Sequence, residues 1–141
     1  MRKRTNNTII VGYFGVGKTC LAEELETAVE LVYSNCQPTV RQLEEALEEY
    51  DIILADPRWL QILQEGHYEF HIVIPAVELK DEYLERFKER YKEKKGCGSI
   101  GFIKVMDRQW DTNLKRLMHT DCLSLTILNK GQYLADVIDK F

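Results

Sequence analysis

Short apolar runs alternate along the chain with segments whose apolar residues recur at helical spacing. Runs made almost entirely of apolar residues are typical of strands that are buried on both faces of a parallel sheet. These runs predict strands at Thr8–Gly12, Val29–Tyr33, Asp51–Asp56, Phe70–Pro75 and Cys122–Leu128. Glu30 interrupts the second run, which makes that strand the least regular of the set.

The segments between these runs carry apolar residues three or four positions apart, which is the pattern of amphipathic helices. Helices are therefore predicted around Leu21–Leu25, from Pro38, at Trp59–Leu63, from Val77 to about Lys95, around Phe102–Leu117 and at Tyr133–Phe141. Strands that alternate with helices are typical of a three-layer sandwich, with helices on both faces of a mostly parallel sheet. We therefore expect a single α/β domain spanning residues 1–141.

The composition is that of an ordinary globular protein, with a formal net charge of −4. A negatively charged chain is not built chiefly to coat nucleic acid, so no nucleic-acid partner is expected. The basic start of the chain is followed by polar residues and a short apolar run, which is neither a signal peptide nor a membrane span. The four cysteines form no CxxC pair, which favours reduced thiols. We expect a cytoplasmic protein with no membrane partner.

The segment between the first predicted strand and the first predicted helix has the strongest chemical signature in the chain. It reads GYFGVGKT and matches the pattern GxxxxGK[ST] at every fixed position. Glycines allow a loop to turn its backbone N–H groups toward one concavity, where phosphate oxygens accept their hydrogen bonds. Lys18 can reach the β- and γ-phosphates, and the Thr19 hydroxyl can bind Mg²⁺.

The pattern therefore predicts bound ATP and Mg²⁺, and a glycine-rich turn that matches by chance is the alternative. The predicted nucleotide-binding residues are Gly12, Tyr13, Phe14, Gly15, Val16, Gly17, Lys18, Thr19 and Cys20.

A second metal ligand is predicted at Asp56, which ends the third strand. A loop of this kind usually needs a carboxylate on a neighbouring strand to hold Mg²⁺. Asp56 is followed by Pro57, and an aspartate before a proline is also typical of the start of a helix. The metal role and the capping role are compatible, and the sequence leaves both open.

A long charged helix is predicted after the fourth strand. Its apolar face is made of residues four apart, namely Leu79, Tyr83, Phe87 and Tyr91. Arg86 and Arg90 flank this face. One interpretation is a solvated amphipathic helix. The other is a lid, residues 77–101, whose arginines neutralise charge on the triphosphate during transfer and whose hinge is the Gly-Cys-Gly break at 96–98. We favour the lid, and predict Lys18, Arg86 and Arg90 as catalytic residues.

Several stretches resemble small phage-type P-loop nucleotide kinases, relatives of the adenylate and deoxynucleoside monophosphate kinases. The stretches that carry the resemblance cover most of the chain and read GYFGVGKT, DIILAD, PAVELKDEYLERFKERY, FIKVMDRQWDTNLKRL and LNKGQYLADVI. The resemblance implies a parallel sheet in the order 2-3-1-4-5, ATP with Mg²⁺ as the phosphoryl donor, and a nucleotide-like acceptor.

Members of that family usually end the second strand with an acidic residue that faces the acceptor. Here the predicted end of the strand reads Val32-Tyr33-Ser34-Asn35, so no carboxylate is expected there. Ser34 and Asn35 are either hydrogen-bonding groups for the acceptor or parts of a simple turn. The resemblance also implies that the turn at 129–131 borders the base.

We expect an ATP-dependent phosphotransferase that acts on a nucleotide or nucleoside-like small molecule. The alternative is a non-catalytic ATP-binding or sensing module, or an NTPase, which the acid-free second strand favours. A kinase of nucleic-acid ends would need a basic groove, which only the charged helix could supply. Cys20 is expected to be a small core residue, and His67 and His71 lack a third ligand for a metal site.

Overall fold

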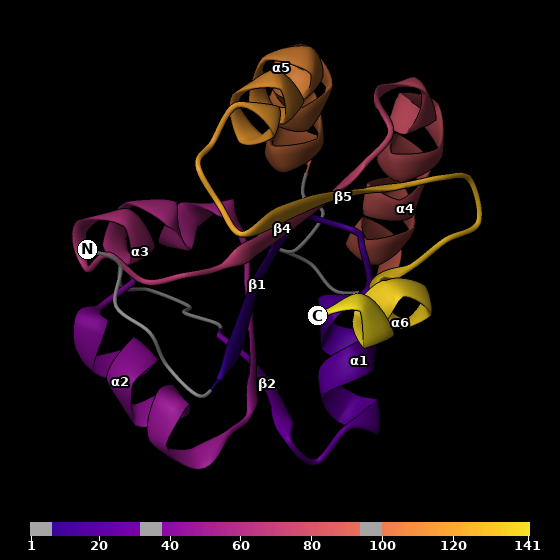
Figure 1. Ribbon diagram of the computed structural model, residues 1–141. Coiled ribbons are helices and arrows are strands. Elements are labelled where there is room, and N and C mark those ends of the chain that lie inside the picture. Colours follow the sequence, from indigo (N-terminus) through magenta and orange to yellow (C-terminus); the bar gives the residue numbers. More distant parts are fainter. Residues whose placement is uncertain (1–6, 32–37, 94–99) are drawn as a thin grey trace.

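The computed structural model describes residues 7–31, 38–93 and 100–141, and Figure 1 shows how they are arranged. The strands are β1 (Thr8–Gly12), β2 (Ala28–Glu30), β3 (Ile52–Ala55), β4 (His71–Pro75) and β5 (Ser124–Leu128). They form one parallel sheet in the order β2-β3-β1-β4-β5. The predicted α/β class and the strand order that the resemblance implied are therefore confirmed.

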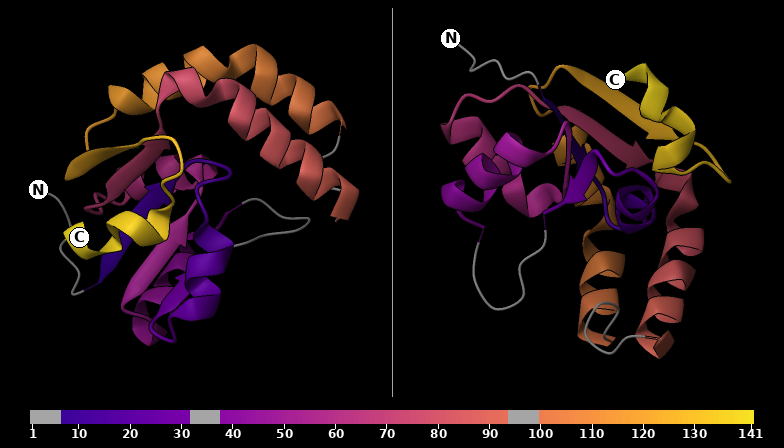
Figure 2. Two further views of the ribbon diagram at one scale, coloured as in Figure 1. Left: turned by 90° about the vertical axis from the view of Figure 1, so that its right-hand side faces the viewer. Right: turned by 90° about the horizontal axis from the view of Figure 1, so that it is seen from below.

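Helices lie on both faces of this sheet. They are α1 (Lys18–Glu24), α2 (Val40–Glu49), α3 (Leu60–Glu65), α4 (Lys80–Glu93), α5 (Ile100–Met118) and α6 (Leu134–Val137), with short 3₁₀ turns η1 (Pro57–Trp59), η2 (Val77–Leu79) and η3 (Ile138–Lys140). Figure 1 shows α1 and α6 on one face, and α2, α3 and α5 on the other. Helices α4 and α5 pack side by side as an antiparallel pair that extends beyond the sheet (Figure 2).

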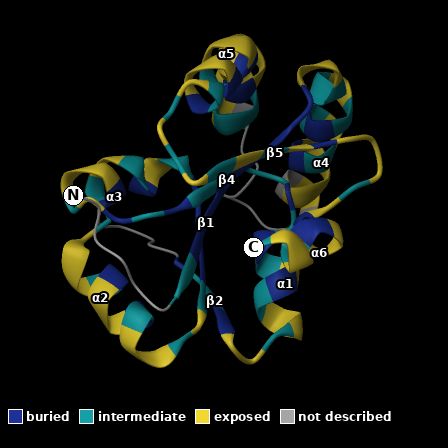
Figure 3. Cartoon of the chain, viewed as in Figure 1, coloured by how far each residue is buried: buried dark blue, intermediate teal, exposed yellow. Residues whose placement is uncertain are grey.

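The centre of the sheet is β1, where Ile9, Ile10 and Val11 are buried. This strand pairs with β3 on one side and with β4 on the other, so both of its edges are hydrogen-bonded. Buried residues gather along the sheet and on the inner sides of the helices (Figure 3). Trp110 on α5 is also buried, and its indole N–H donates to the Val77 carbonyl at 2.8 Å, which ties α5 to the start of the α4 segment.

The second strand differs from its prediction, because β2 ends at Glu30 instead of Tyr33. The backbone N–H of Leu31 still donates to the Leu54 carbonyl at 2.8 Å as the chain leaves the sheet. Strand β2 is at the edge, and Val29 and Glu30 are only half-buried, so the strand tolerates a charged residue. An apolar run therefore does not mark where this strand ends. The expected hydrogen-bonding pair at 34–35 and the expected hinge at 96–98 lie outside the described residues.

Helix α2 begins at Val40, two residues later than the sequence predicts, because Thr39 caps it. The Thr39 hydroxyl accepts from the Gln42 backbone N–H at 3.2 Å, and the Gln42 side chain accepts from the Thr39 backbone N–H at 3.2 Å. Among the residues that the structure describes, no helix is both long and apolar enough to cross a membrane.

Candidate functional site

The loop that joins β1 to α1, called the glycine loop (residues 12–19), has a backbone that its glycines make possible. Gly15 and Gly17 have φ angles of 87° and 99°, in the left-handed region that residues with a Cβ rarely adopt. At Gly12, an added Cβ would lie 2.9 Å from Cγ2 of Val16. The shape of the loop therefore requires glycine at all three positions.

Lys18 lies within this loop, and only 7% of it is exposed. Its ammonium donates hydrogen bonds to the carbonyls of Gly12 at 2.9 Å and Tyr13 at 3.0 Å. Burial lowers the pKa of Lys18 to about 8, although the carboxylates of Glu30 and Asp56 act in the opposite direction. A buried cation whose partners are neutral carbonyls is stabilised when an anion comes close. An anionic ligand close to Lys18 would therefore stabilise its charged form.

Thr19 and Glu30 form a hydrogen-bonded pair next to Lys18. The Thr19 hydroxyl donates to Oε1 of Glu30 at 2.6 Å. The expectation that the second strand ends without a carboxylate is therefore wrong, because Glu30 ends β2 and contacts the glycine loop. The sequence did contain a signal for this residue. It is a lone acid inside the predicted apolar run Val29–Tyr33, which was interpreted only as an irregularity of the strand.

Asp56 follows β3 and has the capping role that its sequence context indicates. Its Oδ1 accepts from the Arg58 backbone N–H at 2.8 Å at the start of η1. The same carboxylate binds the Arg58 guanidinium through Nε at 3.1 Å and Nη2 at 2.7 Å. Asp56 is buried, and its charge raises the pKa of Lys18, so it also lies near the ammonium.

The oxygen atoms of Thr19, Glu30 and Asp56 are the donors that this site offers to a metal ion. Hydroxyl and carboxylate oxygens are hard ligands, which suit Mg²⁺. Across the described ranges, no group of three or more His, Cys, Asp or Glu side chains could hold a metal. A Mg²⁺ ion here would therefore need phosphate oxygens and waters to complete its coordination, which is how proteins usually bind it.

Arg86 reaches the glycine loop from α4. Its Nη1 donates to the Gly15 carbonyl at 2.8 Å. Its guanidinium lies between the rings of Tyr83 and Tyr133, at 4.2 and 4.3 Å from their centroids. Stacking on both sides fixes the orientation of the planar guanidinium while its charge is retained. Arg90, one turn further along α4, is exposed. The predicted pair therefore consists of one anchored and one exposed arginine.

A cavity of about 160 Å³, called the loop cavity, lies beside the glycine loop. Its wall consists of Gly15, Gly17, Lys18, Thr19, Cys20, Glu30, Arg86, Arg90 and Tyr133. The structure thus brings both predicted arginines together with the second half of the predicted nucleotide-binding segment. Gly12 and Val16 are buried and are not in this wall, and Asp56 is not in it either. Tyr13 and Phe14 line a different cavity.

Two residues in the wall of the loop cavity differ from expectation. Tyr133 was missed, because the resemblance pointed to the turn at 129–131 and a tyrosine beyond it follows no motif. Cys20 was expected in the core, but it is exposed and lines the cavity. Helix α1 presents Leu21 to the core, so the preceding residue faces outward.

Comparison with known proteins gives little guidance. No family model matches the chain, and no curated protein matches it. One similar structure is an uncharacterized protein from Eubacterium ventriosum ATCC 27560, with a TM-score of 0.48, 16% identity and 96% of each chain covered. Another comes from the PezAT chromosomal toxin-antitoxin system of Streptococcus pneumoniae, with a TM-score of 0.39, 16% identity, and 93% of this chain and 72% of that one covered. Similarity at this level carries no conclusion about function.

Proposed function

We propose that this chain is an ATP-dependent phosphotransferase of the P-loop nucleotide-kinase type, acting on a nucleotide or nucleoside-like acceptor. The observation that carries the proposal is the state of Lys18. It is a buried ammonium with a lowered pKa, bonded to carbonyls of a glycine loop that lines a cavity. An anionic ligand in that cavity would relieve the cost of burying the charge.

In this proposal, the β- and γ-phosphates of ATP bind in the loop cavity next to Lys18. Arg86 and Arg90 lie on α4 in the wall of the same cavity, and in the lid interpretation they neutralise negative charge on the phosphates. A Mg²⁺ ion, if bound, would add to the neutralisation of the phosphate charge. Thr19 and Asp56 are the residues that would hold it, and Glu30 lies beside Thr19.

Transfer forms a bond between an oxygen of the acceptor, on a hydroxyl or a phosphate group, and the γ-phosphorus, and breaks the bond from that phosphorus to the β–γ bridging oxygen, leaving ADP. Where the attacking oxygen belongs to a hydroxyl, its proton moves to a carboxylate. Glu30 is the best candidate, because it lines the loop cavity and its charge reaches Lys18. Most of the rate increase would come from positioning and charge neutralisation.

The proposal is tested by following labelled phosphate from γ-labelled ATP with Mg²⁺ to a panel of nucleosides and nucleoside monophosphates. The wild-type protein is expected to label at least one acceptor. Lys18→Ala is expected to lower the rate by about a hundredfold or more. Lys88→Ala is the matched control, because Lys88 lies on the surface of α4 and pairs only loosely with Glu85 at 3.3 Å.

Full activity in a folded Lys18→Ala protein would refute the assignment of the glycine loop. Lys18-dependent binding of ATP without any labelled acceptor would support the alternative, a non-catalytic ATP-binding module. Release of ADP and phosphate without a labelled acceptor would support an NTPase.

A further inference from the structure

The edge strand β5 carries a row of apolar side chains that the fold leaves exposed. Leu123, directly before the strand, is 47% exposed, and Leu125 and Ile127 within it are 38% and 44% exposed. Single exposed apolar residues are common on protein surfaces, whereas neighbouring ones mark a surface that a partner can cover. Residues two apart in a strand project from the same face, so these three form one continuous row, called the β5 row.

The β5 row lies on the face of the sheet that carries α5. On the opposite face, the Ser124 hydroxyl lies 2.7 Å from Nδ1 of His71, whose ring lies 4.8 Å from that of Phe141, which follows α6. Ser124 therefore faces the α6 side, and because side chains alternate along a strand, the β5 row faces the other way. Helix α5 packs against β4 on that face, which leaves the edge strand beyond it uncovered.

The backbone of β5 is also open along one side. Within the described residues, β5 pairs with β4 on one side and with no strand on the other, and Figure 2 shows it at the outer edge of the sheet. Edge strands are usually protected from pairing by charged residues, above all lysine, or by proline. The strand reads SLTIL and contains neither. Its free backbone N–H and C=O groups can therefore pair with another strand.

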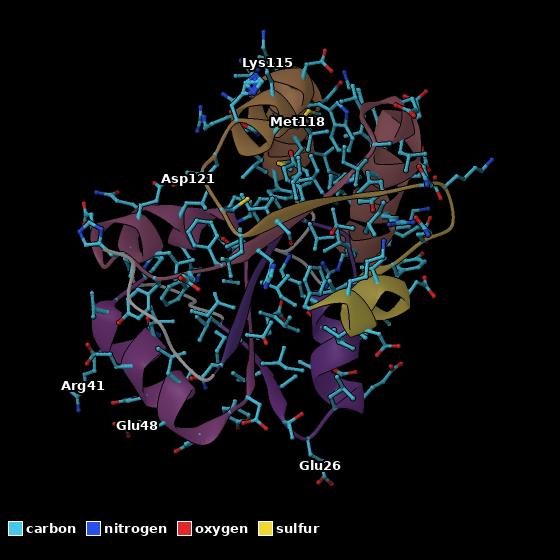
Figure 4. The ribbon with its side chains drawn as sticks, viewed as in Figure 1. Glu26, Arg41, Glu48, Lys115, Met118 and Asp121 are labelled. Carbon is cyan, nitrogen blue, oxygen red and sulfur yellow. The ribbon has the colours of Figure 1, made fainter. Side chains whose placement is uncertain are left out.

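The two ends of β5 carry opposite charges. Asp121, which Figure 4 shows near the start of the strand, is exposed, and so is Lys130 in the turn after the strand. If two copies of β5 lie side by side and antiparallel, Asp121 of each copy comes close to Lys130 of the other. A parallel arrangement would instead bring like charges together, which is unfavourable. The charges therefore fit a second copy of the same strand in the antiparallel orientation.

We propose that the protein forms a two-fold symmetric dimer in which β5 pairs antiparallel with β5 of a second copy, so that the two sheets join into one. A two-fold axis perpendicular to the sheet keeps the same face of both sheets on the same side. With this axis at Leu125, Leu125 faces its own counterpart, and Leu123 of each copy faces Ile127 of the other. Each β5 row then covers the other through cross-strand contacts.

The helices leave room for this pairing. Neighbouring strands lie about 4.8 Å apart, so the two copies of β4 would lie about 14 Å apart. Packed helices need an axial separation of only about 8–10 Å, so the two α5 helices fit side by side above the joined sheet. The antiparallel arrangement also directs the two α4–α5 pairs, which extend beyond the sheet, toward opposite ends of the dimer (Figure 2).

Sedimentation equilibrium of the intact chain, without nucleotide, measures this dimer independently of the proposed function. Between about 1 and 200 µM, the mass is expected to rise from 16.5 kDa toward twice that value, with a Kd of about 10 µM. A weak dimer is expected because one short strand per copy buries less than the roughly 800 Å² per partner of a standard interface.

Leu125→Lys places two like charges opposite each other at the axis, and it is expected to raise the Kd about tenfold or more. Val40→Lys is the matched control, because Val40 is 49% exposed and lies on α2, away from β5 (Figure 1). Its Kd is expected to equal that of the wild type.

Disulfide formation tests the register of the two strands. Leu125→Cys brings two thiols face to face, and directly opposite residues of antiparallel strands have Cα atoms about 4.5–5.5 Å apart, which a disulfide can bridge. Mild oxidation is expected to yield a covalent dimer of Leu125→Cys, well above the background from the native cysteines in the wild type and in Val40→Cys. This variant keeps a small apolar side chain, so it decides the question if Leu125→Lys fails to fold.

The proposal is overturned if the wild type keeps a mass of 16.5 kDa up to about 200 µM. It is equally overturned if folded Leu125→Lys dimerises as well as the wild type, or if Leu125→Cys yields no more covalent dimer than the wild type. Assemblies that grow beyond a dimer with concentration would also overturn it, because a two-fold axis closes after two copies.

Discussion

Replacing Lys18 with methionine tests the environment of the glycine loop quantitatively. The pKa of Lys18 falls from 10.5 to about 8 in the folded protein, chiefly because the ammonium is buried. Since the folded pKa is the lower one, the unfolded chain binds more protons between pH 8 and pH 10.5, and stability rises with pH through that window. Below pH 8, Lys18 is protonated in both the folded and the unfolded state, so burial of its charge lowers the free energy of unfolding by the full amount. The pKa difference, 10.5 − 8, corresponds to about 3 kcal/mol of unfolding free energy.

Lys18→Met removes the charge and keeps a side chain of similar length. It also leaves the carbonyls of Gly12 and Tyr13 without their donor, a cost of about 1–3 kcal/mol each that does not depend on pH. The difference in unfolding free energy, wild type minus variant, is therefore expected to grow by about 3 kcal/mol from pH 7 to pH 10.5. Urea unfolding of both proteins at several pH values measures this difference.

The exposed Lys88 provides the control, because Lys88→Met carries no burial cost and its difference from the wild type is expected to stay flat. An equally flat difference for Lys18→Met would mean that Lys18 titrates as an ordinary surface lysine, and that its charge is not buried in the loop.

Three further predictions follow from the contacts of the loop cavity. Gly15→Ala is expected to destabilise the fold by more than Gly131→Ala in urea unfolding. Both positions have φ above 80°, which costs an alanine about 1–2 kcal/mol. A Cβ at Gly15 would also lie 3.0 Å from Cδ2 of Tyr83, while Gly131 faces open space. Equal losses of stability would mean that Tyr83 does not pack against Gly15. Glu30→Gln keeps an oxygen for Thr19 and removes the charge, so labelled-phosphate transfer should fall about tenfold or more while ATP still binds, and an unchanged rate would exclude Glu30 as the proton acceptor. Arg86→Lys keeps the charge but loses the stacking, so the calorimetric affinity for ATP should fall by about tenfold, and an unchanged affinity would mean that the fixed guanidinium is not used.

The strands that the sequence predicted best are the ones buried on both sides. Strand β1 has neighbours at both edges and buried residues throughout its middle. Because both of its faces are covered, its sequence is an almost uninterrupted apolar run. Edge strand β2 has no such constraint. Its end was misplaced, and with it the carboxylate of Glu30. The order of the strands was not contained in the apolar pattern at all, and came from the resemblance.

The residues of the candidate site that could be predicted are those that belong to a local sequence motif or follow helical spacing. The glycine loop, Lys18 and Thr19 are adjacent in sequence, and Arg86 follows from helical spacing along an apolar face. Tyr133 meets Arg86 only because α6 packs near α1, which no spacing in the sequence reveals. The cavity lined by Tyr13, Phe14 and Asn113 was not foreseen for the same reason, since its wall joins segments about a hundred residues apart.

The proposed binding of the ATP phosphates by the glycine loop depends on the Lys18 ammonium. Its most direct test is calorimetric titration of ATP with Mg²⁺ into the folded protein at pH 7 and pH 9. We expect one bound ATP, with an affinity about tenfold lower at pH 9, because Lys18 loses its proton above pH 8. No detectable binding to Lys18→Ala is expected. Absence of binding to the folded wild type, or equal binding to Lys18→Ala, would contradict it.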